Sequence, residues 1–495
     1  MHTPKRLSVV SQNENVDQEK HRDQTGHLVT PPNLAALTEA EYNTLGKRAT
    51  WKMDIIIMPI MTIMYILNYL DRQNIASARL ANIEEDLNLS DTDYKTAVSI
   101  LFAGYILMQV PSNMIAGKIA WPGLYICSAM AVWGVISALM ATVTSFVGLL
   151  MCRFFLGFVE AVFFPGALFF LSLFYNRQQF ALRTAILYSG SQIGNACGGL
   201  FAIAILNLEG VHGIDGWRWL FIVEGALTVG LAIIFAFLLP NSNKKIIGLN
   251  DLEIEWVQWN FEKDLGQQDS SDDATAWQGL KMAARDPKTW LLMSILYLCY
   301  IVGTVVNFFP SVVSTLGYDR NTTYALTAPP FLLCVFCMLA NGFHSDKKQE
   351  RFYHIVCPFI ITVIANIIAV STLNTGARYL AMMLLPGSFY SSAVVILSWI
   401  TGSLNQPKVK RASAIALINA ICNTPNIWAS YFYIGAPRYL IAFCILLAAS
   451  AGAVIMACVT RMYLSKQNKK MDAGQDVGPS GPTAAQIAAG FRYTL

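Results

Sequence analysis

Met151-Cys-Arg153-Phe-Phe-Leu-Gly-Phe-Val-Glu160-Ala-Val-Phe-Phe-Pro165 lies inside an apolar run, 146–170, that is long enough to cross a bilayer. Arg153 and Glu160 are the charged residues of this run. Residues seven positions apart are two helical turns apart, so both side chains look out from the same face, about 10 Å apart along the axis. A charge in hydrocarbon costs several kcal/mol, so we expect both to face a protein interior or a watery cavity and to have a function.

A second charged stretch lies at the end of the first apolar run and reads Asn68-Tyr-Leu-Asp71-Arg72-Gln-Asn74. Neighbours on a helix point about 100° apart, so Asp71 and Arg72 cannot both point at the same spot. The sequence leaves open which of the two faces a cavity. Two buried arginines and two buried carboxylates in one membrane protein predict an anion site coupled to a proton.

The composition indicates a polytopic membrane protein. Of the 495 residues, 55% are hydrophobic and only 13% are charged, against about 25% charged in a soluble domain. Residues 1–50 are polar and lack the apolar stretch of a signal peptide. The sequence has no Gly-rich phosphate loop, no metal-ligand cluster and no nucleophile–base pair among its motifs, and Cys334 and Cys337 form a CxxC in a predicted span with no second ligand pair near. We therefore expect no enzyme, no metal, no cofactor and no nucleic-acid partner.

Twelve apolar segments of spanning length predict an all-α membrane protein with six helices in each half. They are 53–70, 94–115, 124–142, 146–170, 184–206, 219–239, 290–312, 325–343, 355–373, 379–400, 412–433 and 439–462. We therefore divide the chain into a disordered segment 1–50, a first bundle 51–240, a central loop 241–287, a second bundle 288–464 and a tail 465–495.

Lysine and arginine in the short loops predict that both termini and the central loop are cytoplasmic. The basic residues gather in alternate loops, at 177–183, 347–351 and 408–411, and in the tail. Two glycosylation sequons, Asn88-Leu-Ser90 and Asn321-Thr-Thr323, fall in the predicted outer loops. In the central loop, Leu249–Trp259 reads as an amphipathic helix and 266–273 as a flexible acidic stretch.

One inner loop resembles a signature of the major facilitator superfamily. Gly342-Phe-His-Ser345-Asp346-Lys347, followed by Arg351, is similar to the family's G-x-x-x-D-R/K motif. The resemblance implies two bundles related by a pseudo-two-fold axis, a substrate site near mid-membrane, and an inner gate held by Asp346, Lys347 and Arg351. The equivalent place in the first half, Asn113–Lys118, lacks the aspartate.

Four further motifs resemble the anion:cation symporter branch, and within it the fungal allantoate permease group of nicotinate, pantothenate, biotin and allantoate carriers. They are Tyr69-x-Asp71-Arg72-x-Asn74, Gln109-x-Pro111-Ser-Asn113, Arg153-x-x-x-Gly157-x-x-Glu160 and Gly216-Trp-Arg-Trp-Leu-Phe-Ile-Val-Glu224-Gly225. The resemblance covers about 52–463. It implies that Asp71 and Glu160 titrate the proton and that Arg72 and Arg153 bind the anionic substrate. The competing hypothesis is that these four residues form inert ion pairs between helices.

Other polar residues of the spans are candidates for substrate binding: Asn68, Tyr188, Gln192, Asn195, Asn307, Tyr390 and Asn423. The alternative for each is a helix-to-helix hydrogen bond or packing, which is the commoner role in membranes.

We therefore expect a monomeric carrier in a fungal cell membrane that imports a small organic anion, a carboxylate, together with a proton. Two alternatives stay open on the sequence: an efflux carrier for an acidic metabolite or xenobiotic, and a nutrient sensor that binds without transporting.

Overall fold

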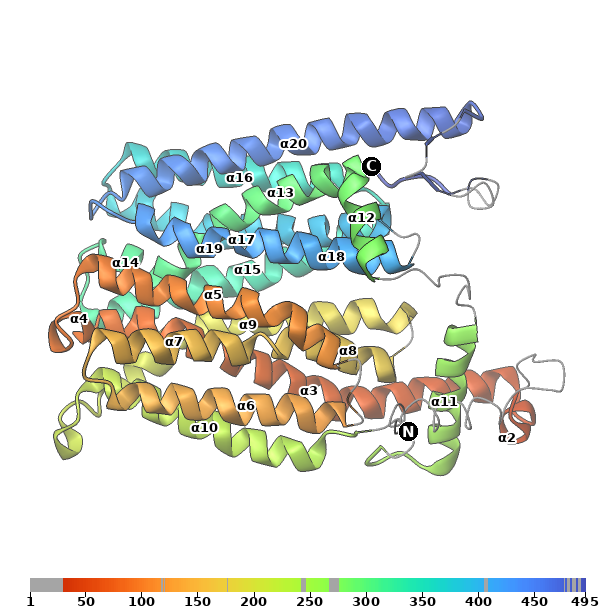
Figure 1. Cartoon of the computed structure of the whole chain (residues 1–495), viewed down its shortest axis with the longest axis horizontal. Helices are drawn as coiled ribbons and strands as arrows, with labels where there is room; N and C mark the ends of the chain where they lie inside the picture. The colour runs from red at the N-terminus through yellow and green to blue at the C-terminus, as the bar shows by residue number, and fades with distance from the viewer. Residues whose placement is uncertain are drawn as a thin grey trace, which may run out of the picture.

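The computed structural model describes residues 30–116, 119, 121–175, 177–241, 246–266, 276–404 and 408–475, and near the end of the chain 477–478, 481–482, 487 and 491–495 (Figure 1). The described residues fold as helices and contain no strand. Each of the twelve predicted spans lies, to within two residues at its ends, in one helix or in consecutive helical segments, which confirms the predicted all-α fold.

The first half has six crossings: α3 (Glu39–Arg79), α5 (Asp91–Ala116), α6 (Pro122–Leu139), α7 (Phe146–Glu160) with α8 (Phe163–Phe174), α9 (Arg177–Leu206) and α10 (Gly216–Leu238). The second half repeats the number: α13 (Pro287–Gly303) with α14 (Phe309–Ser314), α15 (Arg320–Lys348), α16 (Phe352–Ser371), α17 (Thr375–Ser403), α18 (Lys408–Asn423) with α19 (Pro425–Trp428), and α20 (Leu440–Asp472). Short elements connect them: α2 (Pro32–Ala35), α4 (Ile83–Asp86), α11 (Asp251–Gly266) and α12 (Ala276–Arg285), with 3-10 turns η1 (Met140–Thr142), η2 (Val211–Gly213), η3 (Thr304–Phe308) and η4 (Ala429–Phe432).

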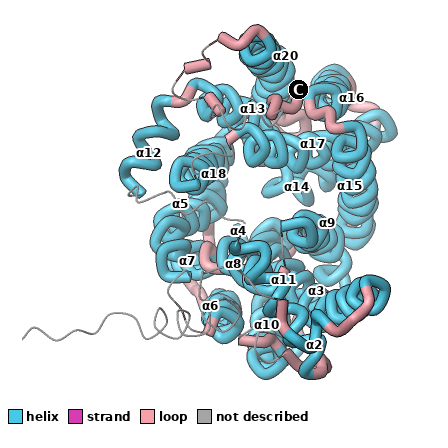
Figure 2. The backbone as a smooth tube through the Cα atoms, turned by 90° about the vertical axis from the view of Figure 1, so that its right-hand side faces the viewer, coloured by secondary structure: helices cyan, strands magenta, loops and turns pink. Residues whose placement is uncertain are grey.

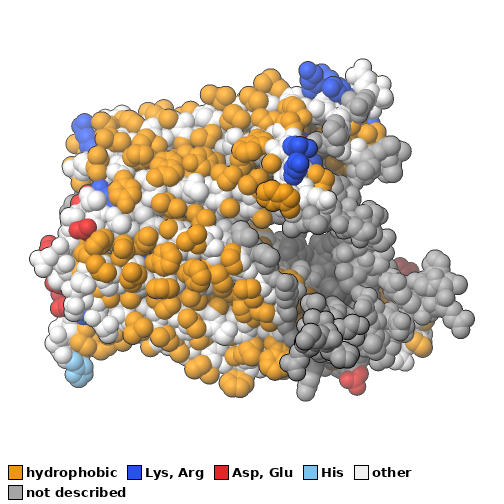
Figure 3. Space-filling model, viewed as in Figure 1, with side chains coloured by type: hydrophobic (Ala, Val, Ile, Leu, Met, Phe, Trp, Pro, Cys, Tyr) orange, Lys and Arg blue, Asp and Glu red, His pale blue; other side chains and the backbone are white. Residues whose placement is uncertain are grey.

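Ten of the crossings in the described part of the chain are long and apolar enough, by length and composition, to span a membrane. The other two are α5, which begins with Asp91, Asp93 and Lys95, and the group α18, α19 and η4, where α18 ends at Asn423. The flank of the bundle is covered by hydrophobic side chains, while most coloured charges lie near its ends (Figure 3). This is the surface that a lipid bilayer solvates.

The two ends of the bundle are unlike. We call the end where α3 begins and α20 finishes the terminal end, and the end that carries α4 the far end (Figure 1). Helix α3 has 41 residues, about 60 Å at 1.5 Å per residue, which is about twice the thickness of a hydrocarbon core. Its first turns therefore project from the terminal end.

Residues 39–50 correct the expectation that all of 1–50 is disordered. Thr38 and Glu41 form a capping box: the Glu41 N–H donates to Thr38 Oγ1 (3.3 Å) and the Thr38 N–H to Glu41 Oε2 (2.9 Å). The central-loop helix predicted at Leu249–Trp259 forms α11, which packs on this part of α3. There Glu253 accepts a hydrogen bond from Lys52 (2.8 Å), so a local cap and a tertiary contact both stabilise the extension.

The end of the chain also docks. Residues 491–495 lie at the terminal end of the second half, where the Tyr493 hydroxyl bonds to Lys288 Nζ (2.7 Å) and Trp399 Nε1 donates to the Thr494 carbonyl (2.8 Å). Helix α20 runs to Asp472, past the expected start of the tail at 465.

The two halves meet along α5 with α18 and α9 with α15 (Figure 2). Hydrogen bonds between the halves gather at the far end: Tyr324 Oη donates to the Ser77 carbonyl (2.7 Å), and Thr96 Oγ1 lies 3.0 Å from Tyr431 Oη. Gly199 permits this approach, because a Cβ there would lie 2.5 Å from the Tyr324 carbonyl oxygen. The far end is therefore closed in this conformation.

Candidate functional site

A cavity lies at the middle of the molecule, between the halves. Of the described residues, the first half contributes aromatic side chains, Arg72 and Gln73, and the second half contributes aromatic side chains and asparagines. Its polar and aromatic lining includes Tyr65, Tyr69, Arg72, Tyr105 and Tyr188 from the first half and Tyr300, Asn307, Tyr390, Asn419, Asn423 and Asn426 from the second. Arg72 is the one charged residue among the described residues that line it.

Arg72 is held in place by a buried carboxylate and by rings. Its Nε donates to Glu160 Oε2 across 2.5 Å, and the Glu160 side chain is fully buried. The guanidinium carbon lies 4.7 Å from the ring centroid of Tyr105 and 5.5 Å from that of Tyr69. A guanidinium has five N–H donors, and the bond to Glu160 uses one, so the group has donors left for an anion.

Asp71 points away from the cavity. It is fully buried between α3, α6 and α10, and its carboxylate accepts hydrogen bonds from Ser137 Oγ (2.6 Å) and Thr228 Oγ1 (3.4 Å). The question that the sequence left open is therefore answered by the packing: Arg72 faces the cavity, and Asp71 lies behind its wall.

Arg153 is also placed differently from the expectation. Its side chain is buried, its Nε donates to the Ala97 carbonyl on α5 (3.3 Å), and it does not line the cavity. Glu160, the last residue of α7, takes Arg72 as its partner, so an inert Arg153–Glu160 pair is the wrong interpretation. Residues two turns apart share a face of a helix, but which neighbours that face meets depends on how the helices pack.

Of the remaining candidates, Tyr188, Asn307, Tyr390 and Asn423 line the cavity. Two of these amides are also bonded to neighbours on the group α18–α19: Asn307 Nδ2 donates to Asn426 Oδ1 (3.1 Å), and Asn423 Nδ2 to the Asn419 carbonyl (2.8 Å).

Asn68, Gln192 and Asn195 do not line this cavity. Gln192 accepts a weak bond from Cys334 Sγ (3.8 Å) across the halves, and Asn195 Nδ2 donates to Gln192 Oε1 (3.5 Å). Asn68 is buried, and its amide nitrogen makes no hydrogen bond. For Gln192 the helix-to-helix alternative describes the contacts better, whereas the bond of Asn195 stays within α9.

The sequence reasoning missed Tyr69 and Tyr105, which flank the cation. A signal for the first existed, since Tyr65, Tyr69 and Arg72 stand at i, i+4 and i+7 and so share one face of α3. Tyr105 comes from α5, and nothing in its own neighbourhood of the sequence relates it to Arg72.

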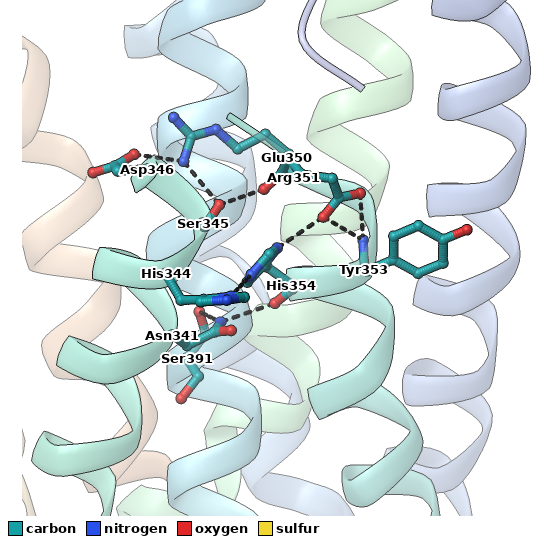
Figure 4. Close-up of polar contacts among 9 residues, drawn as sticks. All are labelled: Asn341, His344, Ser345, Asp346, Glu350, Arg351, Tyr353, His354 and Ser391. Carbon is teal, nitrogen blue, oxygen red and sulfur yellow. Dashed lines mark hydrogen bonds and ion pairs between the residues drawn. The ribbon is translucent and has the colours of Figure 1, made fainter. Parts of the chain in front are cut away.

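The predicted gate residues lie where α15 meets α16, at the terminal end (Figure 4). Arg351 Nη1 bonds to Asp346 Oδ1 (2.6 Å) and to Ser345 Oγ (2.9 Å), while Lys347 is exposed. Beside them His344 Nδ1 lies 2.6 Å from His354 Nε2, and His354 Nδ1 lies 2.7 Å from Glu350 Oε2. These bonds join two helices of the second half, and the gating role stays a prediction. In the first half, 117–118 lie outside the described residues.

The sequons lie together at the far end. Asn88 precedes α5 and Asn321 is the second residue of α15, and both side chains are exposed. Glycosylation at either place stays a prediction. The described residues contain no group of three His, Cys, Asp or Glu side chains arranged to hold a metal ion.

Comparison with known proteins assigns the family. A model described as Major Facilitator Superfamily matches residues 61–430, about three quarters of the chain. The chain belongs to the major facilitator superfamily. It is therefore a multi-pass membrane transporter and not an enzyme, as the sequence predicted.

Related members of the major facilitator superfamily include fungal transporters. The chain is 26% identical to the high-affinity nicotinic acid transporter of Saccharomyces cerevisiae, over 92% of this chain and 86% of that protein. It is 29% identical to the MFS-type transporter cnsO of Penicillium expansum, over 87% and 86%. A solved structure of a bacterial homolog of the human lysosomal transporter Spinster has the same fold: the TM-score is 0.65 with 17% identity, over 83% of this chain and 97% of the other.

Proposed function

We propose that this protein is a symporter that carries a small organic anion, a carboxylate, together with a proton by alternating access. The observation that carries the proposal is Arg72, a cation on the wall of a central cavity, held 2.5 Å from the buried carboxylate of Glu160. Arginine suits this task because its planar fork binds a carboxylate bidentately and stays charged.

The coupling follows from competition for Arg72. Without substrate, Glu160 is anionic and pairs with the guanidinium. A substrate carboxylate that reaches Arg72 takes over part of that pairing, and the fully buried Glu160 then loses the partner that stabilises its charge. A carboxylate without a partner in a low-dielectric interior binds a proton. Anion binding and proton binding therefore favour each other.

The rest of the cavity selects for a flat anion with polar groups. Tyr69 and Tyr105 offer ring faces beside the cation, while Asn307, Asn419, Asn423 and Asn426 on the opposite wall offer amide donors and acceptors. Similarity to a high-affinity nicotinic acid transporter supports a compact aromatic carboxylate as a first substrate to test.

The proposal includes the place and orientation of the protein. We infer a monomer in the cell membrane, with the terminal end and both termini in the cytoplasm and the far end outside. The hydrogen bonds at the far end then close the outer gate, and the Asp346–Arg351 contact belongs to the inner gate. The division into bundles 51–240 and 288–464 around a central loop 241–287 is part of the same proposal.

Uptake of labelled carboxylates into transporter-deficient yeast tests the function. The panel contains nicotinate, pantothenate, allantoate and an aromatic dicarboxylate, measured at acidic and neutral external pH, with and without an uncoupler. We expect accumulation of one of them that is stronger at acidic pH and collapses with the uncoupler. Accumulation that changes neither with the external pH nor with the uncoupler contradicts proton coupling. Faster loss of a preloaded anion from cells that express the protein would favour efflux, and binding without flux would favour a sensor.

A further inference from the structure

A second pair of buried carboxyl groups lies on the side of α3 that faces away from the cavity. Asp71 of α3 is fully buried, and Glu224 of α10 is 1% exposed. Thr228, which stands four residues after Glu224 on the same face of α10, donates a hydrogen bond to Asp71 (3.4 Å), so Glu224 lies one helical turn from the contact between α10 and Asp71. Neither residue lines the cavity, so this pair is distinct from the contact between Arg72 and Glu160.

Asp71 and Glu224 differ in the hydrogen bonds that their carboxyl groups accept. Asp71 accepts hydrogen bonds from Ser137 Oγ at 2.6 Å and Thr228 Oγ1 at 3.4 Å. Both carboxyl oxygens of Glu224 are buried without a hydrogen-bond partner, and the Asn74 amide nitrogen beside it on α3 is likewise unbonded. Leaving a charged carboxylate in this state costs several kcal/mol, so an ionised Glu224 does not fit its surroundings.

Among the described residues, no lysine or arginine forms an ion pair with Asp71 or Glu224. Helix α6 presents only uncharged side chains, Ser137 and Trp133, to Asp71. From α7, Glu160 acts on Asp71 as a like charge, and Arg153 acts as an opposite charge while it is bonded to the Ala97 carbonyl. On α9, the other neighbour of α10, Arg183 pairs with Asp54 at 2.5 Å.

Two carboxylates held together in a low-dielectric interior do not both ionise, because each disfavours the charge of the other. The hydroxyl donors stabilise the anionic form of Asp71, whereas the Asn74 amide beside Glu224 does not come within hydrogen-bond distance of either carboxyl oxygen. We propose that Glu224 and Asp71 form a proton-binding site in which the proton resides on Glu224 and Asp71 carries the charge. This site uses a residue, Glu224, that takes no part in the anion cavity.

The site shares helix α3 with the anion cavity. Asp71 and Arg72 are consecutive, about 100° apart on the helix, so a rotation or tilt of α3 when an anion binds Arg72 also moves Asp71 against Ser137 and Glu224. The proton on Glu224 can then respond to the anion without touching it. This coupling step rests on the proposed function, whereas the proton site itself does not.

Infrared spectroscopy of the purified full-length protein tests the proton site without any substrate. We expect the wild-type protein at neutral pH to show the carbonyl stretch of a buried protonated carboxylic acid, with a small shift in D₂O. Glu224→Gln should remove this band, and Glu39→Gln, at an exposed position of α3, should keep it. A band that persists in Glu224→Gln, or a wild-type protein that lacks it, overturns the proposal.

Ser137→Ala keeps the proposal testable where Glu224→Gln does not fold. This substitution removes the stronger hydrogen bond to Asp71 and leaves Glu224 in place. We expect the carbonyl band to change in frequency, and the pH at which it disappears to change as well. The reason is that loss of the hydrogen bond to Asp71 alters how the proton is distributed between Asp71 and Glu224. An unchanged band and an unchanged titration overturn the assignment of the proton to this pair.

Proton-driven accumulation in proteoliposomes separates the two proposals. A wild-type protein that takes up the anion found in the yeast panel without any effect of a pH gradient contradicts the proposed function, and the infrared band still decides the proton site. A coupled wild-type protein whose Glu224→Gln variant accumulates equally well overturns the role of Glu224 in coupling. We expect that variant to lose accumulation while it keeps exchange of anion for anion.

Discussion

Arg72 on α3 and Glu160 at the end of α7 lie 2.5 Å apart, and this contact positions the cation that the described residues place on the cavity wall. Arg153, on the same helix as Glu160, bonds instead to the Ala97 carbonyl behind the wall. The two arginines therefore have different roles: Arg153 is buried behind the wall, whereas Arg72 is partly exposed on the cavity side.

Replacing each arginine by lysine tests this division. Arg72→Lys keeps the charge but loses the planar fork that binds a carboxylate bidentately. A hydrogen bond to a charged group contributes about 1.5–3 kcal/mol, so we expect the uptake efficiency, kcat/KM, to fall by about one to two orders of magnitude. Arg153→Lys can still donate to Ala97 and should leave KM within about threefold of wild type. Equal losses in KM for both variants would contradict the assignment.

Glu160→Gln should uncouple the protein from the proton. The amide occupies nearly the same space and still bonds to Arg72, but it neither takes up nor releases a proton. We expect accumulation driven by a pH gradient to disappear while exchange of external for internal anion continues. The measurement is efflux and counterflow from proteoliposomes at two pH values. Full accumulation by Glu160→Gln would remove Glu160 from the coupling step.

The closed far end rests in part on the bond from Tyr324 to the Ser77 carbonyl. Tyr324→Phe removes this bond at little change in volume, which costs about 1 kcal/mol and so shifts the balance between closed and open far ends roughly fivefold. Gly199→Leu acts more strongly, because its side chain collides with Tyr324. Accessibility of a cysteine placed at the far end to a membrane-impermeant reagent should rise in both variants. Thr372→Val, at the far end of the second half, is the control.

The orientation of the protein can be checked through its sequons. Asn88→Gln and Asn321→Gln should each remove one glycan-dependent shift on a gel, since both asparagines are exposed at the far end. The carboxy-terminal tail should stay inaccessible to protease added to intact cells. A glycan that survives both substitutions, or a tail cut from outside, would reverse the inferred orientation.

The sequence predicted what depends on local composition. Apolar runs of spanning length predicted all twelve crossings, and the change at Pro287 from polar loop to apolar run matches the start of α13. The helical period also predicted that Asp71 and Arg72 face different ways. Which way each faces depends on how α3 is rotated against α6, α7 and α10, and that rotation is set by packing over the whole bundle.

Glu160 is a second residue whose partner depends on helix packing and could not be predicted from the sequence. Its spacing from Arg153 predicted a shared face, but the carboxylate ends α7, next to the break before α8, and so reaches Arg72 on α3. Tyr105 reaches Arg72 from another helix of the first bundle, and the amides of the second half line the same cavity only because two bundles far apart in sequence close around it. Contacts of this kind have no signature in a single stretch of sequence.

The docked residues 491–495 allow a last prediction, on stability. Asn468 of α20 forms two hydrogen bonds with the Tyr493 backbone, at 2.8 and 2.9 Å, and the Arg351 N–H donates to the Leu495 carbonyl (2.7 Å). Together with Lys288 and Trp399, these contacts tie four helices of the second half at the terminal end. Asn468→Ala removes both bonds to Tyr493, which we expect to lower the free energy of unfolding by about 1–3 kcal/mol and to raise hydrogen exchange in 491–495 and at the start of α16.

Arg492→Ala provides the matched control for this prediction. Arg492 lies in the same segment, but its ion pair with Asp472 is largely exposed to solvent, and exposed pairs contribute only about 0–1 kcal/mol. We therefore expect Arg492→Ala to change neither the thermal unfolding of the detergent-solubilised protein nor the exchange at the start of α16. If Asn468→Ala and Arg492→Ala behave alike, the segment does not stabilise the second half, because only the first substitution removes the partly buried hydrogen bonds to the Tyr493 backbone.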